Sequence, residues 1–595
     1  MDGLLFEPLK YYSDYARDAH KENVSSHFDS LLSASQIDIE QNRKIVSEYD
    51  LEMAKVEKIN GKLRGYRIGV GFLVALIVIG FVAFVIGVCI INQYRIPSIC
   101  AIIGGILGVI VGFVVIFAVL RPKIKHHEEL KNKHLQRAQE LKNVAFSQMA
   151  PLNALFDGGD TLRLIEKTMP QIKFDLTYST NRERELIEEY DYVDMTDEET
   201  SVIDTLGGTM LKNPFLYERY LDHTMGTQTY TGTLTISWRV AYRDSEGRLR
   251  YRTRTQVLHA SVTKPKPYYT VCTHLGYGCD TAPDLSFSRN ESDTDELSER
   301  ALARRIKKGE KKLKDRAEKS ISKGGGFQEM VNSEFDVLFG AHNRNHEVQF
   351  RLMYTPLAQN NTVDLLRSKQ GYGDDFNIIK QGRYNIVKSN HAQAWDMARN
   401  GSRFCSYSVD IARRIFQEYN EEYFKSVFFD FAPLLAVPAY QDPPAHFAKE
   451  PRQFANNYNY YEYECLANAI GEGAFAHSDT KTRSILKAQF VDKRGDVDRV
   501  AITAHSYKTI KRVDYVSVLG GDGRMHLVPV HWIEYIPITK ISQMAVKSLG
   551  ITEKQLRDKG KSYPQNACYL HGLLAYQLNG EESWEDIEKT FNQYT

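Results

Sequence analysis

Two long apolar runs separated by a short polar loop dominate the hydrophobic pattern near the start of the sequence. Residues 68–91 and 98–120 contain no charged side chain, and only residues 92–97 lie between them. An α-helix needs roughly 20 residues to cross a hydrocarbon core about 30 Å thick. We therefore predict a transmembrane helical hairpin. A cleaved signal peptide does not fit, because the first run begins at residue 68 and a second run follows it.

Basic residues on either side of the hairpin predict its orientation. The connecting loop holds one cation, Arg95, and cytoplasmic flanks carry the excess of Lys and Arg in membrane proteins. We expect a multi-pass protein of the plasma (inner) membrane with both termini cytoplasmic. The scattered positions of the seven cysteines suit a reducing compartment. The flanking cations are Lys55, Lys58, Lys62, Arg64 and Arg67 before the first run, and Arg121, Lys123, Lys125, Lys131 and Lys133 after the second.

Small residues recur at helical spacing in both apolar runs. Such residues let two helix backbones approach closely. We expect the two small faces to pack against each other within the hairpin; a homo-oligomer or a pore is the alternative. A conducting pore usually needs polar or ionisable side chains, and neither run supplies an ionisable one. The transmembrane packing residues are Gly71, Ala75, Ala83 and Gly87 in the first run, and Gly104, Gly108 and Gly112 in the second.

Helix-favouring segments flank the apolar runs. Apolar residues at three- and four-residue spacing predict one buried helix face in each segment. We expect an N-terminal cytosolic helical segment at residues 1–67 and a helical stalk at residues 121–150, paired like a short coiled coil that reaches roughly 40 Å at about 1.5 Å per residue. Independent amphipathic helices, one lying on the membrane, are the alternative. The apolar positions are Ile45, Tyr49, Met53 and Val56, then Leu135, Ala138, Leu141, Ala145 and Met149.

A long hairpin is the clearest element of residues 151–288, which we predict to form a β-rich α+β domain. Apolar and polar residues alternate along residues 229–243 and 248–262, as is typical of half-buried strands. Residues 244–247 would form a four-residue turn. An acidic segment at residues 182–198 comes before the hairpin and is expected to begin as a helix.

The expected register of this hairpin gathers arginines on one face. A four-residue turn pairs Arg243 with Arg248 and places Trp238 opposite Thr253, so that apolar side chains share the other face. Like charges directly opposite one another are unfavourable, and an anionic neighbour is therefore expected. The candidates are the acidic segment or solvent, the anionic inner leaflet, and nucleic acid or a phosphorylated ligand, whose phosphate suits arginine. The predicted anionic-surface residues are Arg239, Arg243, Arg248, Arg250, Arg252 and Arg254.

Charges separate by sign along residues 289–326. Residues 291–299 hold five acids, and residues 300–323 hold eleven Lys or Arg against three acids before a run of three glycines. This pattern predicts a flexible linker or an exposed surface helix at a domain boundary. A second contact with the membrane or with nucleic acid is the alternative.

The remaining residues, 327–595, predict an α+β domain. Sequential hairpins favour a mainly antiparallel sheet with helices packed on it, and the apolar run 427–437 is too short to span a bilayer, so we expect it in the core. Strands are expected at residues 334–339, 347–354, 376–380, 384–388, 484–491 and 499–505, with a hairpin at 513–519 and 524–536; helices are expected at residues 408–425, 460–470, 540–556 and 584–592.

No motif of a common enzyme class occurs in the sequence. The phosphate-binding G-x-x-x-x-G-K-[ST] loop, the nucleophile elbow G-x-S-x-G and the zinc-binding H-E-x-x-H are all absent. Cys272, His274 and Cys279 lack the tight pairing of a zinc site, and His342 and His346 lack a carboxylate between them. We therefore assign no cofactor, no metal and no catalytic residue. The net charge of +1 makes nucleic acid an unlikely partner for the chain as a whole.

The fold class expected from these patterns is a membrane protein with an N-terminal transmembrane hairpin and stalk, followed by a cytosolic α+β region. We expect a membrane-anchored, cytosol-facing scaffold or regulatory protein that binds a protein partner or anionic lipid. A membrane-tethered enzyme with an unrecognised site is one alternative. The other is an oligomeric membrane effector or pore that is triggered by its cytosolic domain.

Overall fold

The structure is a computed structural model that describes residues 5–90, 95–175, 178, 180–192, 196–243, 245–394, 399–442, 459–549, 566–580 and 582–593. The chain forms two compact units. The first comprises Met1–Val24, Asp157–Asn400 and Tyr419–Thr595, and the second comprises Ser25–Phe156 and Gly401–Glu418. Helices α2 (Arg17–Ser35) and α13 (Val409–Leu435) run through both.

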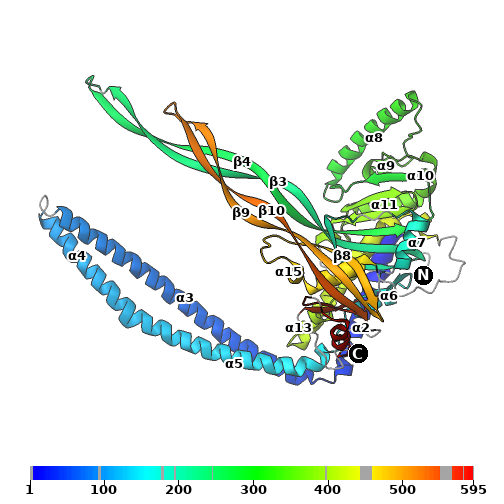
Figure 1. Cartoon of the computed structure of the whole chain (residues 1–595), viewed down its shortest axis with the longest axis horizontal. Helices are drawn as coiled ribbons and strands as arrows, with labels where there is room; N and C mark the ends of the chain where they lie inside the picture. The colour runs from blue at the N-terminus through cyan, green and yellow to red at the C-terminus, as the bar shows by residue number, and fades with distance from the viewer. Residues whose placement is uncertain are drawn as a thin grey trace. The chain divides into compact units, whose positions relative to one another are not determined.

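The second unit is built on a long helical hairpin. Helix α3 (Ile39–Ile90) is one unbroken helix of 52 residues, and α4 (Arg95–Val114), the π-helical segment η3 (Val115–Leu120) and α5 (Arg121–Asn153) follow one another on the return path (Figure 1). Both arms are long enough and apolar enough to cross a membrane. The expected pair of apolar helices is therefore present.

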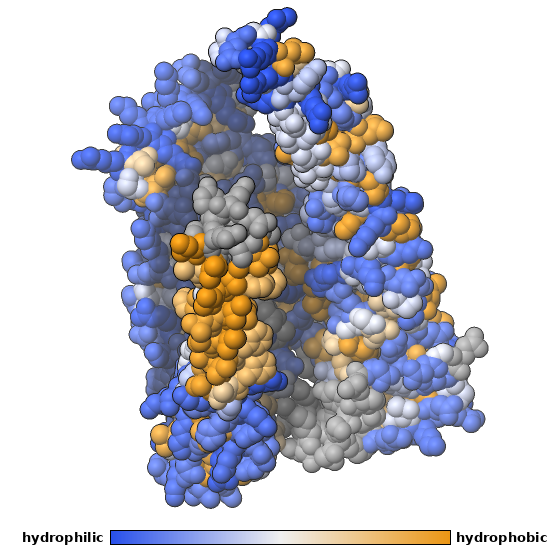
Figure 2. Space-filling view, turned by 90° about the vertical axis from the view of Figure 1, so that its left-hand side faces the viewer, coloured by the Kyte–Doolittle hydropathy of each residue, from blue (hydrophilic) through white to orange (hydrophobic). Residues whose placement is uncertain are grey.

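The apolar part of this hairpin presents its side chains outward. Phe72 is 68% exposed, Ile79 65%, Ile103 61% and Leu107 63%. Figure 2 shows a band of hydrophobic side chains on this face of the molecule, with hydrophilic side chains below it. Each large apolar side chain left in water forgoes roughly 1.5 to 3 kcal/mol of burial free energy. The two helices that carry this apolar band could span a membrane.

Below the apolar band, α3 and α5 pack together as a charged stalk. Val56, Ile59 and Leu63 are buried on α3, and Ala138 and Leu141 are buried on α5. The predicted helix faces are confirmed at Val56, Ala138, Leu141, Ala145 and Met149. The prediction is wrong at Leu135, which is 45% exposed, because its neighbour His134 takes the inner position, with its Nδ1 2.6 Å from an Oε2 of Glu52.

Two antiparallel sheets form the framework of the first unit. One has seven strands in the order β1-β2-β3-β4-β7-β6-β5, and the other has five in the order β11-β12-β10-β9-β8. The strands are β1 (Ile172–Phe174), β2 (Thr200–Met210), β3 (Asn213–Arg243), β4 (Leu249–Gly278), β5 (Ser286–Arg289), β6 (Phe376–Gln381), β7 (Tyr384–Ser389), β8 (Ile485–Arg494), β9 (Val497–Leu519), β10 (Met525–Ser548), β11 (Ala567–Leu570) and β12 (Leu573–Gln577).

Each sheet extends into a long two-stranded ribbon (Figure 1). We call β3–β4 the first ribbon and β9–β10 the second ribbon. Strand β2 stops pairing with β3 at Asp222, and β3 and β4 then pair with each other out to Arg243 and Leu249. At about 3.3 Å per residue, residues 223–243 reach roughly 70 Å beyond the sheet. Both ribbons are far longer than the predicted hairpins.

Helices cover the sheets of the first unit. The buried apolar run 427–437 belongs to α13 and the turn after it, as expected, and it packs in the main core with Phe215, Leu275 and Val387 of the seven-stranded sheet. The helices not yet named are α1 (Pro8–Tyr11), α6 (Asp160–Thr168), α7 (Thr180–Tyr190), α8 (Glu299–Ser322), α9 (Ser333–Phe339), α10 (Glu347–Met353), α11 (Pro356–Arg367), α12 (Asn390–Ala394), α14 (Tyr460–Ile470), α15 (Glu472–Phe475) and α17 (Trp584–Asn592).

Three predicted elements are wrong. The strands expected at 334–339 and 347–354 are helices α9 and α10, because the side chains of Asn332 and His346 cap their first turns. The helix expected from residue 540 is the end of β10, because pairing with β9 and β12 holds it extended; residues 550–556 of that prediction lie outside the described residues. The charged segment 289–326 contains α8 and lies between β4 and β7, which pair in one sheet.

Candidate functional site

The tip of the first ribbon carries the predicted arginine cluster, but in a different register. Arg243 pairs with Leu249, Tyr242 with Arg250 and Trp238 with Arg254. The predicted pairing is therefore wrong by one residue. The turn contains five residues rather than four, and Gly247 supplies its positive φ of 77°, a conformation that glycine adopts without strain.

A shift of one residue exchanges the faces of a strand. Arg250, Arg252 and Arg254 consequently share a face with Trp238 and Tyr242, since directly opposite residues point to the same side. Arg239 and Arg243 share the other face with Leu249 and Tyr251. The six arginines thus form no single basic face, and each face of the tip mixes arginine with aromatic or aliphatic side chains.

The tip arginines are exposed, with few carboxylates near them. Arg248 forms an ion pair of 3.0 Å with Glu246 in the turn, and Arg243 donates to the carbonyl oxygen of Gly247 at 3.4 Å. Within the described part of the chain, Arg239, Arg252 and Arg254 have no carboxylate at ion-pair distance. The acidic helix α7 instead directs Glu185 to Arg182, at 2.6 Å.

Large apolar side chains accompany the arginines. Leu249 is 60% exposed, Tyr251 66% and Tyr242 46%. Arginine and tyrosine are enriched among the residues that dominate binding energy at protein interfaces, and aromatic side chains also favour the membrane interface. The tip therefore exposes aromatic, aliphatic and arginine side chains together.

The second ribbon packs along the first and fixes its direction. Ile236, Leu258 and Val528 are buried between the two ribbons, and Gln256 accepts a hydrogen bond of 2.8 Å from the backbone N–H of Gly521. Polar contacts continue the interface: Lys264 lies 2.7 Å from Asp514 and 4.3 Å from the ring centre of Trp532. A single ribbon in water would be marginally stable, so this packing is what makes the projecting tips possible.

The second ribbon carries a binding-type surface of its own, which the sequence reasoning missed. Near its tip, at residues 513–519 and 525–527, the side chains at odd positions point away from the first ribbon, and the large ones among them are exposed. The sequence signal for this surface was the apolar side chain at odd positions of residues 513–519. It was not sufficient, because apolar residues also occupy even positions, which face the first ribbon. The exposed outer residues are Val513 (40%), Tyr515 (66%), Leu519 (63%), Met525 (61%) and Leu527 (61%).

The predicted transmembrane packing face is only partly right. The seam between α3 and α4 is formed by Gly80, Gly105 and Gly112: a Cβ on Gly105 would lie 2.5 Å from the carbonyl oxygen of Gly80. Of the predicted residues, Gly112 lies in this seam, whereas a Cβ on Gly71, Gly104 or Gly108 would meet no atom within 4 Å.

The other three residues predicted to pack between the helices are Ala75, Ala83 and Gly87. Ala75 is exposed and Ala83 is half-buried, and the surroundings of Gly87 lie outside the described part. Four-residue spacing alone could not locate the seam, because α3 and α4 each carry small residues on two sides. The closest approach of the two helices is at Gly80 and Gly105, which the prediction omitted.

A basic groove of about 1000 Å³ runs along α8. Leu302 and Leu313 are buried beneath the helix, and Gly309 allows Val337 of α9 to approach, because a Cβ there would lie 2.4 Å from a methyl group. Six cations outnumber two acids in its lining. The contact of residues 289–326 with a membrane or with nucleic acid stays a prediction. The cations are Arg304, Arg305, Lys308, Lys312, Arg316 and Lys319.

The residues considered for metal or enzyme chemistry are dispersed. His274 is buried, with its Nε2 2.8 Å from the Oε2 of Glu218, whereas Cys279 lies at the far end of β4 and contacts Thr281. His346 caps α10, and His342 bonds the carbonyl oxygen of Asp336 at 3.0 Å. Within the described ranges, no three His, Cys, Asp or Glu side chains are placed to hold a metal ion.

A buried histidine network lies beside the seven-stranded sheet, centred on His391 of α12. His391 Nδ1 lies 2.6 Å from Asp375 and its Nε2 lies 3.3 Å from Asp430, which also accepts hydrogen bonds from Ser389 and Tyr217. Burial alone would lower the pKa of His391, but Asp430 and Asp375 outweigh it and raise that pKa to about 10. With side chains this buried, the network holds α12, β7 and α13 together.

Comparison of the chain with protein-family models, with curated proteins and with solved structures found no match. The candidate site therefore stands on its geometry: two packed ribbons whose tips expose arginine, aromatic and aliphatic side chains.

Proposed function

We propose that the protein is a membrane-anchored, cytosol-facing scaffold or regulatory protein of the plasma membrane. The apolar helices α3 and α4 form the anchor, and the positive-inside rule places both termini in the cytoplasm. The ribbons of the tethered unit present surfaces to a protein partner or to anionic lipid.

The exposed apolar side chains at the ribbon tips carry this proposal. Leu249 and Tyr251 on the first ribbon, with Leu519 and Met525 on the second, are each at least 60% exposed. Exposed apolar patches mark binding surfaces on folded proteins, and the adjacent arginines favour a partner with negative charge.

Photo-crosslinking in intact cells tests the proposal. A benzophenone amino acid replaces Tyr251 at the tip, and the matched control replaces Leu352 of α10, which is 71% exposed. We expect a discrete adduct from position 251 and none from position 352. Mass spectrometry of the adduct distinguishes a protein partner from a lipid. Identical patterns from both positions would contradict a binding role for the tip.

A second candidate, an oligomeric membrane effector, is favoured by two glycines of the hairpin. An added Cβ on Gly104 or Gly108 would meet no atom within 4 Å, and open space beside small residues is what helix association through them requires. Crosslinking in native membranes of the parent and of Gly108→Leu tests it. A monomer in both proteins would exclude this candidate.

A further inference from the structure

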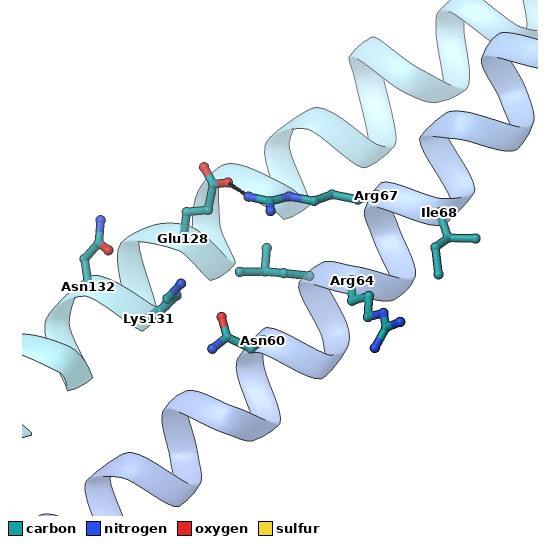
Figure 3. A pocket seen from close by; sticks show the side chains of 8 residues that line it. Asn60, Arg64, Arg67, Ile68, Glu128, Lys131 and Asn132 are labelled. Atoms are coloured by element: carbon teal, nitrogen blue, oxygen red, sulfur yellow. Dashed lines mark hydrogen bonds and ion pairs between the residues drawn. The ribbon is translucent and has the colours of Figure 1, made fainter. Parts of the chain in front are cut away.

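A groove of about 690 Å³ lies in the stalk where it meets the apolar helices. Both helices contribute to it: α3 supplies Asn60, Leu63, Arg64, Arg67 and Ile68, and α5 supplies Glu128, Lys131 and Asn132 (Figure 3). The groove is lined mainly by polar side chains, although it adjoins the most apolar part of the molecule.

The charges around the groove are unbalanced. Arg67 reaches across from α3 to Glu128 on α5, with 3.0 Å between Nη2 and Oε1 (Figure 3), so that one cation neutralises the one acid in the lining. Arg64 and Lys131 remain, and within the described residues neither forms an ion pair. Two positive charges and the amides of Asn60 and Asn132 therefore face the same groove without an anion.

The position of the groove next to the apolar helices indicates which class of anion it would bind. Ile68, which lines it, is the first residue of the predicted span and is 66% exposed. An anion at Arg64 would thus sit about one helical turn from the apolar band, and Lys131, which lies eleven residues or roughly 16 Å beyond Leu120, would contact it from the cytosolic side. That level corresponds to the headgroups of the inner leaflet, and acyl chains attached to the anion would run along the exposed faces of α3 and α4.

We propose that this groove binds the phosphate headgroup of an anionic phospholipid, with Arg64 and Lys131 contacting the phosphate and Asn60 and Asn132 donating amide hydrogen bonds. Basic pockets between helices at the cytoplasmic side are suited to such headgroups, and a guanidinium matches phosphate oxygens in charge and geometry. This inference rests on the membrane anchoring proposed above. The bound lipid would join the two stalk helices directly beneath the bilayer and make the stalk sensitive to membrane composition.

Native mass spectrometry of the full-length protein in mild detergent tests the inference. Equal amounts of phosphatidylglycerol and phosphatidylcholine are added, and bound lipids are counted for the parent, for Arg64→Gln/Lys131→Gln and for Lys62→Gln/Lys133→Gln. The control pair removes the same charge from the same two helices, two positions away in each, at residues outside the groove. Helical content by circular dichroism verifies that the variants fold.

We expect the parent to prefer phosphatidylglycerol, the groove pair to lose this preference by roughly ten-fold or more, as two basic contacts near an anionic surface imply, and the control pair to retain it. No preference in the parent, or an equal loss in both pairs, would overturn the inference. Competition by inorganic phosphate at the same concentration would overturn the lipid as the source of the anion.

Flotation with phosphatidylcholine vesicles separates this inference from the anchoring on which it rests. A protein that does not float contradicts the membrane anchor itself. A protein that floats but shows no headgroup preference keeps the anchor and loses only the groove site.

Discussion

Trp238 lies directly opposite Arg254 across the first ribbon. The indole packs toward the turn of the second ribbon, where a Cβ on Gly521 would lie 2.9 Å from the Trp238 ring, and Arg254 is exposed beside it. This pair marks the point at which the buried interface between the ribbons gives way to the mixed arginine and aromatic surface of the tip. The identity of the tip faces therefore depends on this register.

Engineered disulfides check the register. Tyr242→Cys/Arg250→Cys places two thiols on directly opposite residues, at a Cβ separation of roughly 4.5 to 5.5 Å, whereas Tyr242→Cys/Leu249→Cys places them on opposite faces. We expect mild oxidation to give the 242–250 crosslink in most molecules, as read by peptide mass spectrometry. A dominant 242–249 crosslink would restore the register expected from a four-residue turn.

The close contact between the ribbons at Gly232 predicts that one added methyl group there lowers stability. A Cβ on Gly232 would lie 2.1 Å from the carbonyl oxygen of Pro529, so Gly232→Ala must push the ribbons apart. We expect a loss of about 1 to 3 kcal/mol, as for other overpacked sites, and faster hydrogen exchange in residues 513–530. Gly473→Ala, which meets no atom within 4 Å, is the control. Unchanged exchange in Gly232→Ala would show that the ribbons do not pack in solution.

Two neighbouring glycines of α4 should respond differently to the same substitution. Gly105→Leu collides with the backbone of Gly80, whereas Gly108→Leu enters open space. We expect Gly105→Leu to lower the free energy of unfolding in an SDS titration by about 1 to 3 kcal/mol and Gly108→Leu to change it by less than about 0.5 kcal/mol. The opposite order would place the seam on the face predicted from Gly104, Gly108 and Gly112.

The His391 network predicts a pH dependence with a definite sign. The pKa of His391 is raised to about 10, so its contribution to stability is complete below the unfolded value of about 6.5 and is lost as the pH rises through 10. At pH 7 we expect His391→Gln to lose several kcal/mol, since each unit of pKa shift corresponds to about 1.4 kcal/mol. Denaturant titrations of both proteins should converge between pH 7 and pH 10. A difference that does not vary with pH would contradict a charged His391.

Local patterns predicted the elements that depend on local chemistry. Helices α14 and α17 begin where Asn459 and Ser583 cap their first turns, and their predicted bounds match the structure. The two apolar helices were also predicted correctly, because each run is long and contains no charged residue. In each case a signal within a few residues of the element determined its type.

Two failures, at α9 and α10, come from the local capping side chains Asn332 and His346, which the strand predictions overlooked. The other failures arise where residues distant in the sequence determine the structure. The end of β10 has an amphipathic pattern that suits a helix, but Met544 to Ser548 pair with β12, and only this pairing makes the segment extended. The arginine face failed because one extra turn residue reverses every side chain. The proposed headgroup groove could not be predicted from the sequence, since Arg64 and Lys131 line one groove only because α3 packs on α5.

Labelling with a membrane-impermeant thiol reagent tests the anchored, cytosol-facing arrangement most directly. In a background without native cysteines, Ile96→Cys reports on the loop end of the hairpin and Leu249→Cys reports on the ribbon tip; these positions are 77% and 60% exposed. In intact cells we expect labelling of Ile96→Cys alone, with Leu249→Cys labelled only after permeabilisation and both proteins resistant to alkaline extraction. Labelling of Leu249→Cys in intact cells, or release of the protein by alkali, would contradict this arrangement.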